Sequence, residues 1–566
     1  MTDIRTESNA RRVLLVGDTT LDPLARMLDK GSDAPRLQTF AAPYGQVYQI
    51  LLDANHSAWS VRPETLVVWT VPHLTLPSVK KLLLCNFASA PEEYDAALRE
   101  AEQFGEAVVA ASERVCQVLV PTWVLPTHER WIQTLTWRHG VGVSNLLAKA
   151  NLLLADKFAA IENIVLLDAA YWHASLERPA YDPRMYAVAK ILYSPQLFEK
   201  AAAEIKAVLR GTLGLAKKVI VCDLDNTLWG GVVGDDGAQN LKLGAPDPLG
   251  ECFVAFQTAL KAFRSRGILL TICSKNDESL ALSTIEEHPA MILRKNDFVA
   301  WRINWKDKAE NLLNLAEELN LGLESFVFLD DSPQERDQVR QILPQVYVPD
   351  MPASPSLFAP FLTTLNCFET QGVGKEDLER TAMYQAERGR KEALDLSGDV
   401  DNWLGSLQIE VRAAPLRRES LVRATQLLNK TNQFNLSLRR LDESAFWNWS
   451  AEPNHSAYTF NVTDRFGDFG LVGLASFAVT GSEARIVDFV MSCRVMGKKV
   501  EEALLGYTVN SARAVGAEQV MASPVEGPRN QPARSFFASK FSNPDVASID
   551  PIRVLIPPQI TMKEES

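Results

Sequence analysis

Three short stretches of the chain place carboxylate or hydroxyl groups directly after runs of apolar residues. VIVCDLDNTLWGG carries Asp223 and Asp225, TICSKND carries Ser274, and FVFLDDSPQER carries Asp330 and Asp331. The apolar runs predict buried strands of a parallel sheet, and reactive groups gather at the carboxyl ends of such strands. We therefore expect these five side chains to meet at one edge of a sheet.

Carboxylates, a hydroxyl and a lysine in this order suit chemistry on a phosphoryl group. Carboxylates from two strands provide the oxygen ligands that Mg²⁺ prefers, and a hydroxyl and an ammonium can hold the other phosphoryl oxygens. Lys308 begins the predicted helix KAENLLNLAEELN, and Lys306 just before it is the alternative. Each piece alone is common outside active sites, but the ordered set predicts a metal-dependent phosphoryl-transfer site.

The ordered set resembles the haloacid dehalogenase (HAD) superfamily of phosphoryl-transfer enzymes, which implies a role for each residue. Asp223 is then the nucleophile and a metal ligand, and Asp225 is the general acid/base whose backbone carbonyl also binds Mg²⁺. The supporting roles fall to Thr227 in the loop, Ser274 at the phosphoryl oxygen, Lys308 as the lysine, Asp331 as a metal ligand and Asp330 as a metal-site residue acting through water.

Longer strings are similar to the FkbH-like branch of the HAD superfamily over residues 211–566. They are DLDNTLWGGVVGDDG, TICSKND, NWKDKAEN, FLDDSPQER, ATQLLNKTNQFNLSLRR, DRFGDFGLVG and MSCRVMGKKVEEALL. The resemblance implies a Mg²⁺-dependent glyceryl transferase/phosphatase of polyketide-type secondary metabolism. Such an enzyme loads a glyceryl unit from 1,3-bisphosphoglycerate onto the phosphopantetheine thiol of an acyl carrier protein and releases phosphate.

Two other functions stay open. One is a Mg²⁺-dependent phosphatase of a small phosphate ester, with the last domain carrying out a separate N-acylation. The other is a scaffold that docks a carrier protein and retains a relict site, against which the complete set of site residues argues.

Acyl transfer at carbon needs a sulfur nucleophile, so the cysteines near the site are candidates. Cys273 directly precedes Ser274, Cys222 directly precedes Asp223, and Cys493 lies in the last domain. Side chains alternate along a strand, which directs Cys222 into the core; the same objection to Cys273 is weaker because strand ends bend. Cys273 is the first candidate for an acyl carrier, Cys493 the second, and direct attack by the carrier protein's own thiol is an equal alternative.

The region that positions these groups has clear helix and strand signals. VIVCDLD, ILLTICS, MILRK, FVFLDD and VYVPD predict strands, and ECFVAFQTALKAFRSRG predicts a helix with an apolar face that ends at Gly267. In SPQERDQVR, Ser332, Pro333 and Glu335 predict a helix start through an N-cap, an N1 proline and a capping-box glutamate.

Residues 1–210 alternate short apolar strands with helical stretches and predict an α/β domain. The opening VLLVGDTTLD resembles the SGNH hydrolases, with Thr19 where their serine would stand. Their closing Asp-x-x-His has no match, since Asp182 is followed by Met185 and the spacing of DAAYWH differs. We therefore expect a degenerate, non-catalytic SGNH-like domain.

Residues 361–566 begin helical and become rich in strands, which predicts a mixed α+β domain. SCRVMGKKVEEALL resembles the pantetheine-pyrophosphate loop of GCN5-related N-acetyltransferases (GNAT), because Arg494 and Gly497 match the pattern. Lys499 stands where that family has a small residue, and Lys498 and Lys499 are implied to meet a phosphopantetheine phosphate. An active transferase and a docking scaffold both remain open for this domain.

The length, net charge and cysteine content of the chain limit these expectations. The chain has 566 residues, which predicts several domains. We expect an α/β multidomain protein in which a HAD-like domain with a Rossmannoid parallel sheet, residues 211–360, lies between the two flanking domains. A net charge of −12 disfavours nucleic acid and anionic membrane as partners. The 7 dispersed cysteines, the absence of a signal peptide in MTDIRTESNARR and the absence of a long apolar run predict a reduced cytoplasmic protein.

Overall fold

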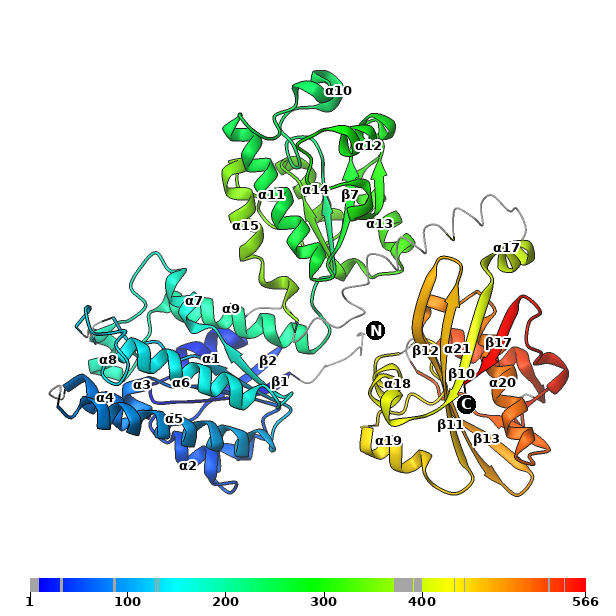
Figure 1. Cartoon of the computed structure of the whole chain (residues 1–566), viewed down its shortest axis with the longest axis horizontal. Helices are drawn as coiled ribbons and strands as arrows, with labels where there is room; N and C mark the ends of the chain where they lie inside the picture. Colours follow the sequence, from blue (N-terminus) through cyan, green and yellow to red (C-terminus); the bar gives the residue numbers. More distant parts are fainter. Residues whose placement is uncertain are drawn as a thin grey trace, which may run out of the picture. The chain divides into compact units, whose positions relative to one another are not determined.

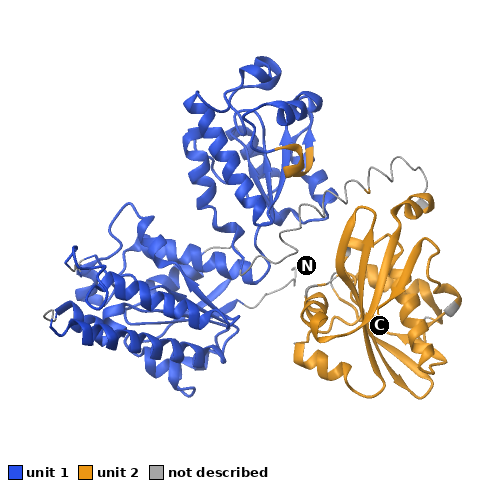
Figure 2. Ribbon diagram, viewed as in Figure 1, with its two compact units in different colours: residues 1–293, 302–377 blue, residues 294–301, 378–566 orange. Residues whose placement is uncertain are grey.

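A computed structural model of the chain (Figure 1) describes residues 10–30, 34–84, 88–127, 129, 132–370, 390, 400–431, 433–441, 443–527, 530–543 and 545–565. The chain divides into two compact units, residues 1–293 with 302–377 and residues 294–301 with 378–566 (Figure 2). It is a multidomain α/β protein whose described residues form three sheets. Within the described residues, no helix combines the length and the apolar character that crossing a membrane requires.

The first sheet is parallel and has helices on both faces. Its strand order is β2-β1-β3-β4-β5, with β1 Arg11–Gly17, β2 Leu37–Ala41, β3 Thr65–Trp69, β4 Gln117–Pro121 and β5 Ile164–Leu167. Alternate residues of β1 enter two different cores. Leu14 and Val16 pack among α2 (Val47–Leu52), α5 (Ala90–Ser112) and α6 (Val143–Phe158), whereas Val13 and Leu15 pack among α1 (Asp22–Asp29) and α9 (Pro195–Thr212). Burial on both faces explains the unbroken apolar run of β1.

The second sheet has four strands in the order β8-β7-β6-β9. They are β6 Val219–Cys222, β7 Leu269–Ser274, β8 Phe298–Ile303 and β9 Phe326–Leu329, and β6 pairs in parallel with both β7 and β9. The strand predicted at MILRK is wrong, because Lys295–Asp297 forms a 3₁₀ turn and the strand follows it in FVAWRI. The predicted strand VYVPD is reduced to an isolated bridge between Val327 and Tyr347.

The structure confirms two predicted helices of this region, with two differences at their starts. The helix predicted from Glu251 begins at Pro248, and Glu335 pairs with Lys275 instead of completing a capping box. In α11, Pro248–Ser265, the side chain of Asp247 caps the N-terminus and Phe253, Phe256, Leu260 and Phe263 are buried. In α14, Pro333–Ile342, the Oγ of Ser332 accepts a hydrogen bond from the Glu335 amide. The cap fixes the chain's change from strand to helix directly after Asp330 and Asp331.

The third sheet has eight strands in the order β15-β16-β14-β13-β12-β11-β10-β17. Its central strands, β10 Ile409–Pro415, β11 His455–Asp464, β12 Gly467–Thr480 and β13 Glu483–Met491, are antiparallel to their neighbours in sequence. β14 Gln519–Ala522 runs parallel to β13, and β17 Ile560–Glu564 runs parallel to β10. Helix α20, Val500–Ala514, packs on one face, and α18, Arg418–Lys430, packs on the other.

We predict that Phe256→Ala lowers the stability of the region around α11. Phe256 is fully buried and its ring lies 5.5 Å from that of Phe358 on α15, Phe358–Thr364. Truncation leaves a cavity that costs about 3–5 kcal/mol, so the melting temperature recorded by calorimetry should fall. Leu357→Ala is the control, because Leu357 is 53% exposed; equal melting temperatures for both variants would contradict the packing described.

Candidate active site

The register of three strands brings the predicted site residues together. Cys222, the last residue of β6, lies opposite Ile272 of β7 and Leu329 of β9. The Asp223 amide then donates a hydrogen bond of 3.0 Å to the Leu329 carbonyl. Asp223 therefore emerges from the sheet beside Asp330, as the sequence predicts.

A buried lysine joins the two strand ends. Nζ of Lys308, the first residue of α13 (Lys308–Leu319), lies 3.1 Å from Asp223 Oδ1 and 2.5 Å from Asp330 Oδ2. Burial alone would lower the pKa of Lys308, but the neighbouring carboxylates raise it above its ordinary value. Lys306 is exposed and pairs instead with Glu310 at 2.9 Å. Of the two candidate lysines, the structure places Lys308 at the site.

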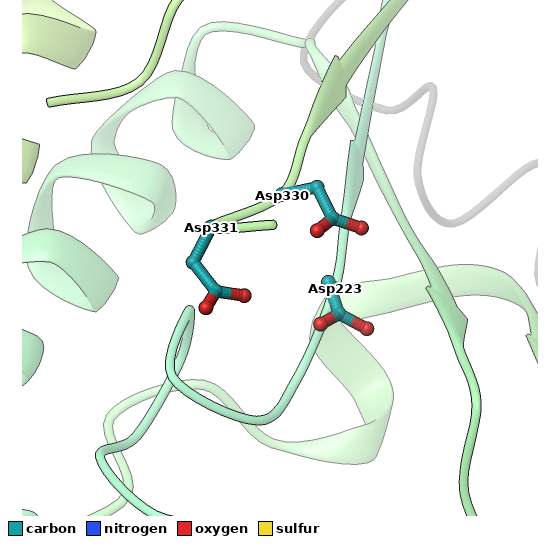
Figure 3. A group of neighbouring side chains, drawn as sticks. All are labelled: Asp223, Asp330 and Asp331. Atoms are coloured by element: carbon teal, nitrogen blue, oxygen red, sulfur yellow. The ribbon is translucent and has the colours of Figure 1, made fainter. Parts of the chain in front are cut away.

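Three carboxylates form a group suited to a metal ion. One oxygen from each of Asp223, Asp330 and Asp331 lies within 4.8 Å of the others (Figure 3). Asp223 Oδ1, although close to Lys308 Nζ, receives no well-aligned hydrogen bond from the described residues. A buried carboxylate oxygen without such a bond is costly unless another ligand compensates it. The donor set, oxygen only and anionic, fits a hard cation such as Mg²⁺.

Burial and the neighbouring charges raise the pKa of two carboxyls of this group. Burial, together with the charge of Asp223, raises the pKa of Asp330 to about 7. Burial also raises the pKa of Asp331. Thr227 lies beside Asp331, whose amide donates a 3.2 Å hydrogen bond to the threonine Oγ1. Thr227 thus supports the loop, as the sequence analysis expected.

Asp225 is held by the loop that follows β6. Its Oδ1 accepts hydrogen bonds from Trp229 Nε1 at 2.8 Å and from the Val233 amide at 3.1 Å. Its Oδ2 accepts a 2.9 Å hydrogen bond from Asn276 Nδ2. Burial raises the pKa of the Asp225 carboxyl, which favours the protonated form that a general acid needs.

Ser274 ends β7 and is 2% exposed. Its carbonyl accepts a 3.1 Å hydrogen bond from the Asn304 amide in the loop before α13. Ser274 and Lys308 are therefore tied to one another through the loop at residues 304–307.

The structure weighs against Cys273 as an acyl carrier. Its thiol is fully buried and donates a hydrogen bond of 3.8 Å to the Lys308 carbonyl. Burial raises the pKa of this thiol well above its usual range, and the thiolate is the reactive form. Cys222 is buried in the same way, as expected of a core residue, and the side chain of Cys493 lies outside the described residues.

The N-terminal domain places Asp18 and Thr19 at the end of β1. Asp18 Oδ2 accepts hydrogen bonds from Thr75 Oγ1 at 2.5 Å and from the Val71 amide at 3.1 Å. Asp168 caps α7, Ala169–Ala174, and burial lowers the pKa of His173 in that helix to about 4. These carboxylates have structural partners, and the absence of catalysis in this domain stays a prediction.

In the loop expected to bind phosphopantetheine in the C-terminal domain, the arginine and lysine side chains contact other groups of the protein. Arg494 Nε lies 3.1 Å from Ser492 Oγ, and Lys498 Nζ donates to the Arg494 carbonyl at 3.1 Å. Gly497 adopts a φ of +74°, which a glycine accommodates readily. Lys499 pairs with Asp401 at 2.6 Å. The structure gives no support to a cofactor-binding role for Arg494, Gly497 and Lys498.

The sequence analysis missed two residues that hold the site. Asn276 is 4% exposed and reaches Asp225. Arg336 on α14 is 7% exposed, and its Nη1 donates to the carbonyls of Asp330 at 2.6 Å and Asp331 at 2.8 Å. The only signal was their place in TICSKND and FLDDSPQER, directly after residues with a proposed role.

One solved structure is similar to a large part of this chain. It is the N-terminal part of the protein BF1531 from Bacteroides fragilis, which contains a phosphatase domain and is complexed with Mg. It is 29% identical with a TM-score of 0.58, and the match covers 64% of this chain and 94% of that chain. No model of a protein family and no curated protein matches the sequence.

Two acetyltransferases are more distant. One is the ribosomal-protein-S18-alanine N-acetyltransferase from Escherichia coli, 14% identical, with a TM-score of 0.18 over 24% of this chain and 88% of that chain. The other is a fungal GCN5-related glucosamine N-acetyltransferase region, 10% identical, with a TM-score of 0.20 over 94% of this chain and 77% of that chain. At these TM-scores the likeness carries no argument about this chain.

We predict that Arg336→Met weakens metal binding about 10–100-fold. The change removes the hydrogen bonds that fix the backbone of Asp330 and Asp331 while leaving every carboxylate in place. Isothermal titration with Mg²⁺ or Mn²⁺ measures the effect. Arg340→Met is the matched control on the same helix, because Arg340 binds Val348 and Asp350 instead. Equal affinities in both variants would show that Arg336 does not hold the site.

Proposed function

We propose that this protein is a Mg²⁺-dependent phosphatase acting at the Asp223 site. The observation that carries the proposal is the group of three carboxylates, two of them buried, with Lys308 beside Asp223. Asp223 Oδ1 receives no well-aligned hydrogen bond from the described residues. The similarity to the BF1531 fragment, a phosphatase-domain protein complexed with Mg, supports it. Asp223, Asp331, Asp330 and the Asp225 carbonyl would hold the ion, which would neutralise charge on the phosphoryl group.

In the first step, a carboxylate oxygen of Asp223 attacks phosphorus and the bond from phosphorus to the leaving oxygen breaks. Asp225 is placed to give its proton to that oxygen, because burial raises the pKa of its carboxyl and so favours the protonated form. Lys308 and Ser274 would hold the phosphoryl oxygens, where negative charge develops. The products are a phosphorylated Asp223, a free alcohol or acid, and an ionised Asp225.

In the second step, Asp225 takes a proton from a water molecule that attacks the same phosphorus. The bond between phosphorus and Asp223 breaks, so that the nucleophile is restored and inorganic phosphate leaves. Trp229 and Asn276 keep the Asp225 carboxyl in one orientation through both transfers. The same group thus serves as acid and then as base.

We predict that Asp223→Asn abolishes phosphate release from p-nitrophenyl phosphate or acetyl phosphate, lowering kcat/KM at least about 10⁴-fold. The amide is a much weaker nucleophile, and the metal site loses one charge. Asp235→Asn is the matched control, because Asp235 is exposed on the short helix α10, Val233–Asp236. Phosphate release that is reduced equally in both variants would contradict the assignment of Asp223.

A second candidate is transfer of a glyceryl unit from 1,3-bisphosphoglycerate to the phosphopantetheine thiol of an acyl carrier protein. The strings of the FkbH-like branch support it, and an acyl phosphate would fit the same metal, lysine and serine. The thiol would then attack the acyl carbon and phosphate would leave. Because Cys273 is buried with a raised pKa, the carrier's own thiol is the better candidate for this attack.

We predict that Cys273→Ala keeps most of the phosphate release and, if the transfer occurs, most of the glyceryl loading. Intact-mass analysis of phosphopantetheinylated carrier protein, incubated with the enzyme, Mg²⁺ and 1,3-bisphosphoglycerate, measures loading. A mass gain that disappears in Cys273→Ala while phosphate release persists would restore Cys273 as the acyl carrier. Phosphate release without any mass gain in the unchanged protein would favour the phosphatase.

A further inference from the structure

Strands β13 and β14 of the C-terminal sheet diverge. Their parallel pairing covers only Glu483–Ile486 of β13 and Gln519–Ala522 of β14. β13 continues to Met491, still paired with β12 on its other edge. The last five residues of β13 therefore present backbone groups to the side from which β14 has departed, and such groups need partners when buried.

The chain itself supplies these partners. Asn435 forms an antiparallel bridge with Val490. The Leu436 amide donates to the Phe489 carbonyl at 3.0 Å, and the Met491 amide donates to the Phe434 carbonyl at 3.0 Å. Residues 434–436 thus lie along β13 as an inserted strand.

The far edge of the inserted strand is paired as well. The Val525 amide, beyond the end of β14, donates to the Leu436 carbonyl at 2.8 Å. Asn530 Nδ2 donates to the carbonyls of Asn435 and Val525 at 3.1 and 2.7 Å. Residues 434–436 therefore bridge the gap from β13 to the segment after β14.

Buried polar side chains fix the inserted strand in place. Asn435 is fully buried and uses both ends of its amide, donating to the Leu428 and Thr431 carbonyls and accepting from the Ser437 and Leu438 amides. Asp488 of β13 is also fully buried and accepts hydrogen bonds from Ser437 and Arg439. Arg439 is 28% exposed, and its ion pair with the buried Asp488 ties the end of this segment to β13.

The N-terminus of α20, at the end of the gap, has a carboxylate beside it. Glu501 lies in the first turn of α20, and burial raises the pKa of its carboxyl. A carboxylate beside the amides of this helix end disfavours a phosphate there. Lys498 and Lys499, the two neighbouring cations, are engaged by the Arg494 carbonyl and by Asp401.

From these contacts we infer that the C-terminal domain binds neither coenzyme A nor a carrier's phosphopantetheine arm between β13 and β14. The GNAT resemblance implies such a group, with its phosphates at the loop before α20. An arm that extends from this loop into the gap would need the backbone groups that residues 434–436 already pair, and its phosphates would face Glu501. The domain therefore carries out no acyl transfer from a thioester held in this gap. The inference is independent of the phosphatase proposal.

Hydrogen exchange of the unchanged full-length protein tests the inserted strand. The amides of Leu436, Met491 and Val525 should exchange at least about 100-fold more slowly than those of the turn between β12 and β13, because they pair within a sheet. Exchange of residues 434–438 as fast as that of the turn would overturn the inference.

Titration with coenzyme A and with acetyl-CoA to ~1 mM, a range that covers weak binding, tests the closed gap. We expect no saturable heat and no change in the exchange of residues 434–438 and 489–499. Saturable binding that alters exchange in either segment would overturn the inference. Binding that leaves both segments unchanged would place the ligand elsewhere and support it.

A variant of Arg439 tests whether its contact with Asp488 holds residues 434–438 in place. Arg439→Met removes the ion-pair partner of Asp488 and leaves its hydrogen bonds with Ser437 and Ser476. It should speed the exchange of residues 434–438 by about tenfold or more. Arg485→Met is the matched control on β13, since Arg485 is 58% exposed. Unchanged exchange in Arg439→Met would contradict the anchoring role, and if this variant does not fold, the measurements on the unchanged protein decide the inference.

Discussion

The arrangement of the four-stranded sheet depends on the burial of more negative than positive charge at the ends of β6 and β9. Lys308 lies against Asp223 and Asp330, and Asp331 adds a third carboxylate within the same group. Removing several charges from water costs several kcal/mol per ion unless the interior compensates them. Without a bound cation, the raised pKa of Asp330 relieves part of this repulsion by protonation. A divalent cation would relieve it more fully, and this is why a charge-rich site is held in a buried position.

The surrounding structure holds the carboxylates close together despite their mutual repulsion. Three groups each bind a different part of the site. The Leu329 carbonyl binds the Asp223 backbone, and the Arg336 guanidinium binds the backbone of Asp330 and Asp331. The side-chain amide of Asn276 binds the Asp225 carboxylate. Because the carboxylates repel one another, each must be held by its own contacts. The cap at Ser332 completes the set by ending the strand at a defined residue.

The sequence predicted those parts of the fold that local patterns encode. The strand ends at Asp223 and Asp330 follow from unbroken apolar runs, and α11 follows from its buried aromatic face. β2 is harder to recognise from sequence, because Leu37 is its only buried residue. β8 was placed too early because Met291 and Leu293 are buried without being in a strand. Contacts such as Arg336 to Asp330 depend on side-chain direction in three dimensions, which spacing alone does not specify.

The closed gap in the C-terminal sheet changes how the candidate functions compare. A phosphatase fused to an N-acyltransferase needs a thioester site in this domain, and residues 434–436 occupy the backbone groups that the thioester arm would use. A glyceryl transferase needs no such site, because the acyl phosphate would lie at Asp223 and the incoming thiol would have to reach it there. Both the phosphatase and the glyceryl transferase therefore concentrate their chemistry on one group of carboxylates. The carboxyl ends of β6, β7 and β9 are then the place where substrate selection must be sought, whether the bond that breaks is to phosphorus or from the acyl carbon to the phosphate oxygen.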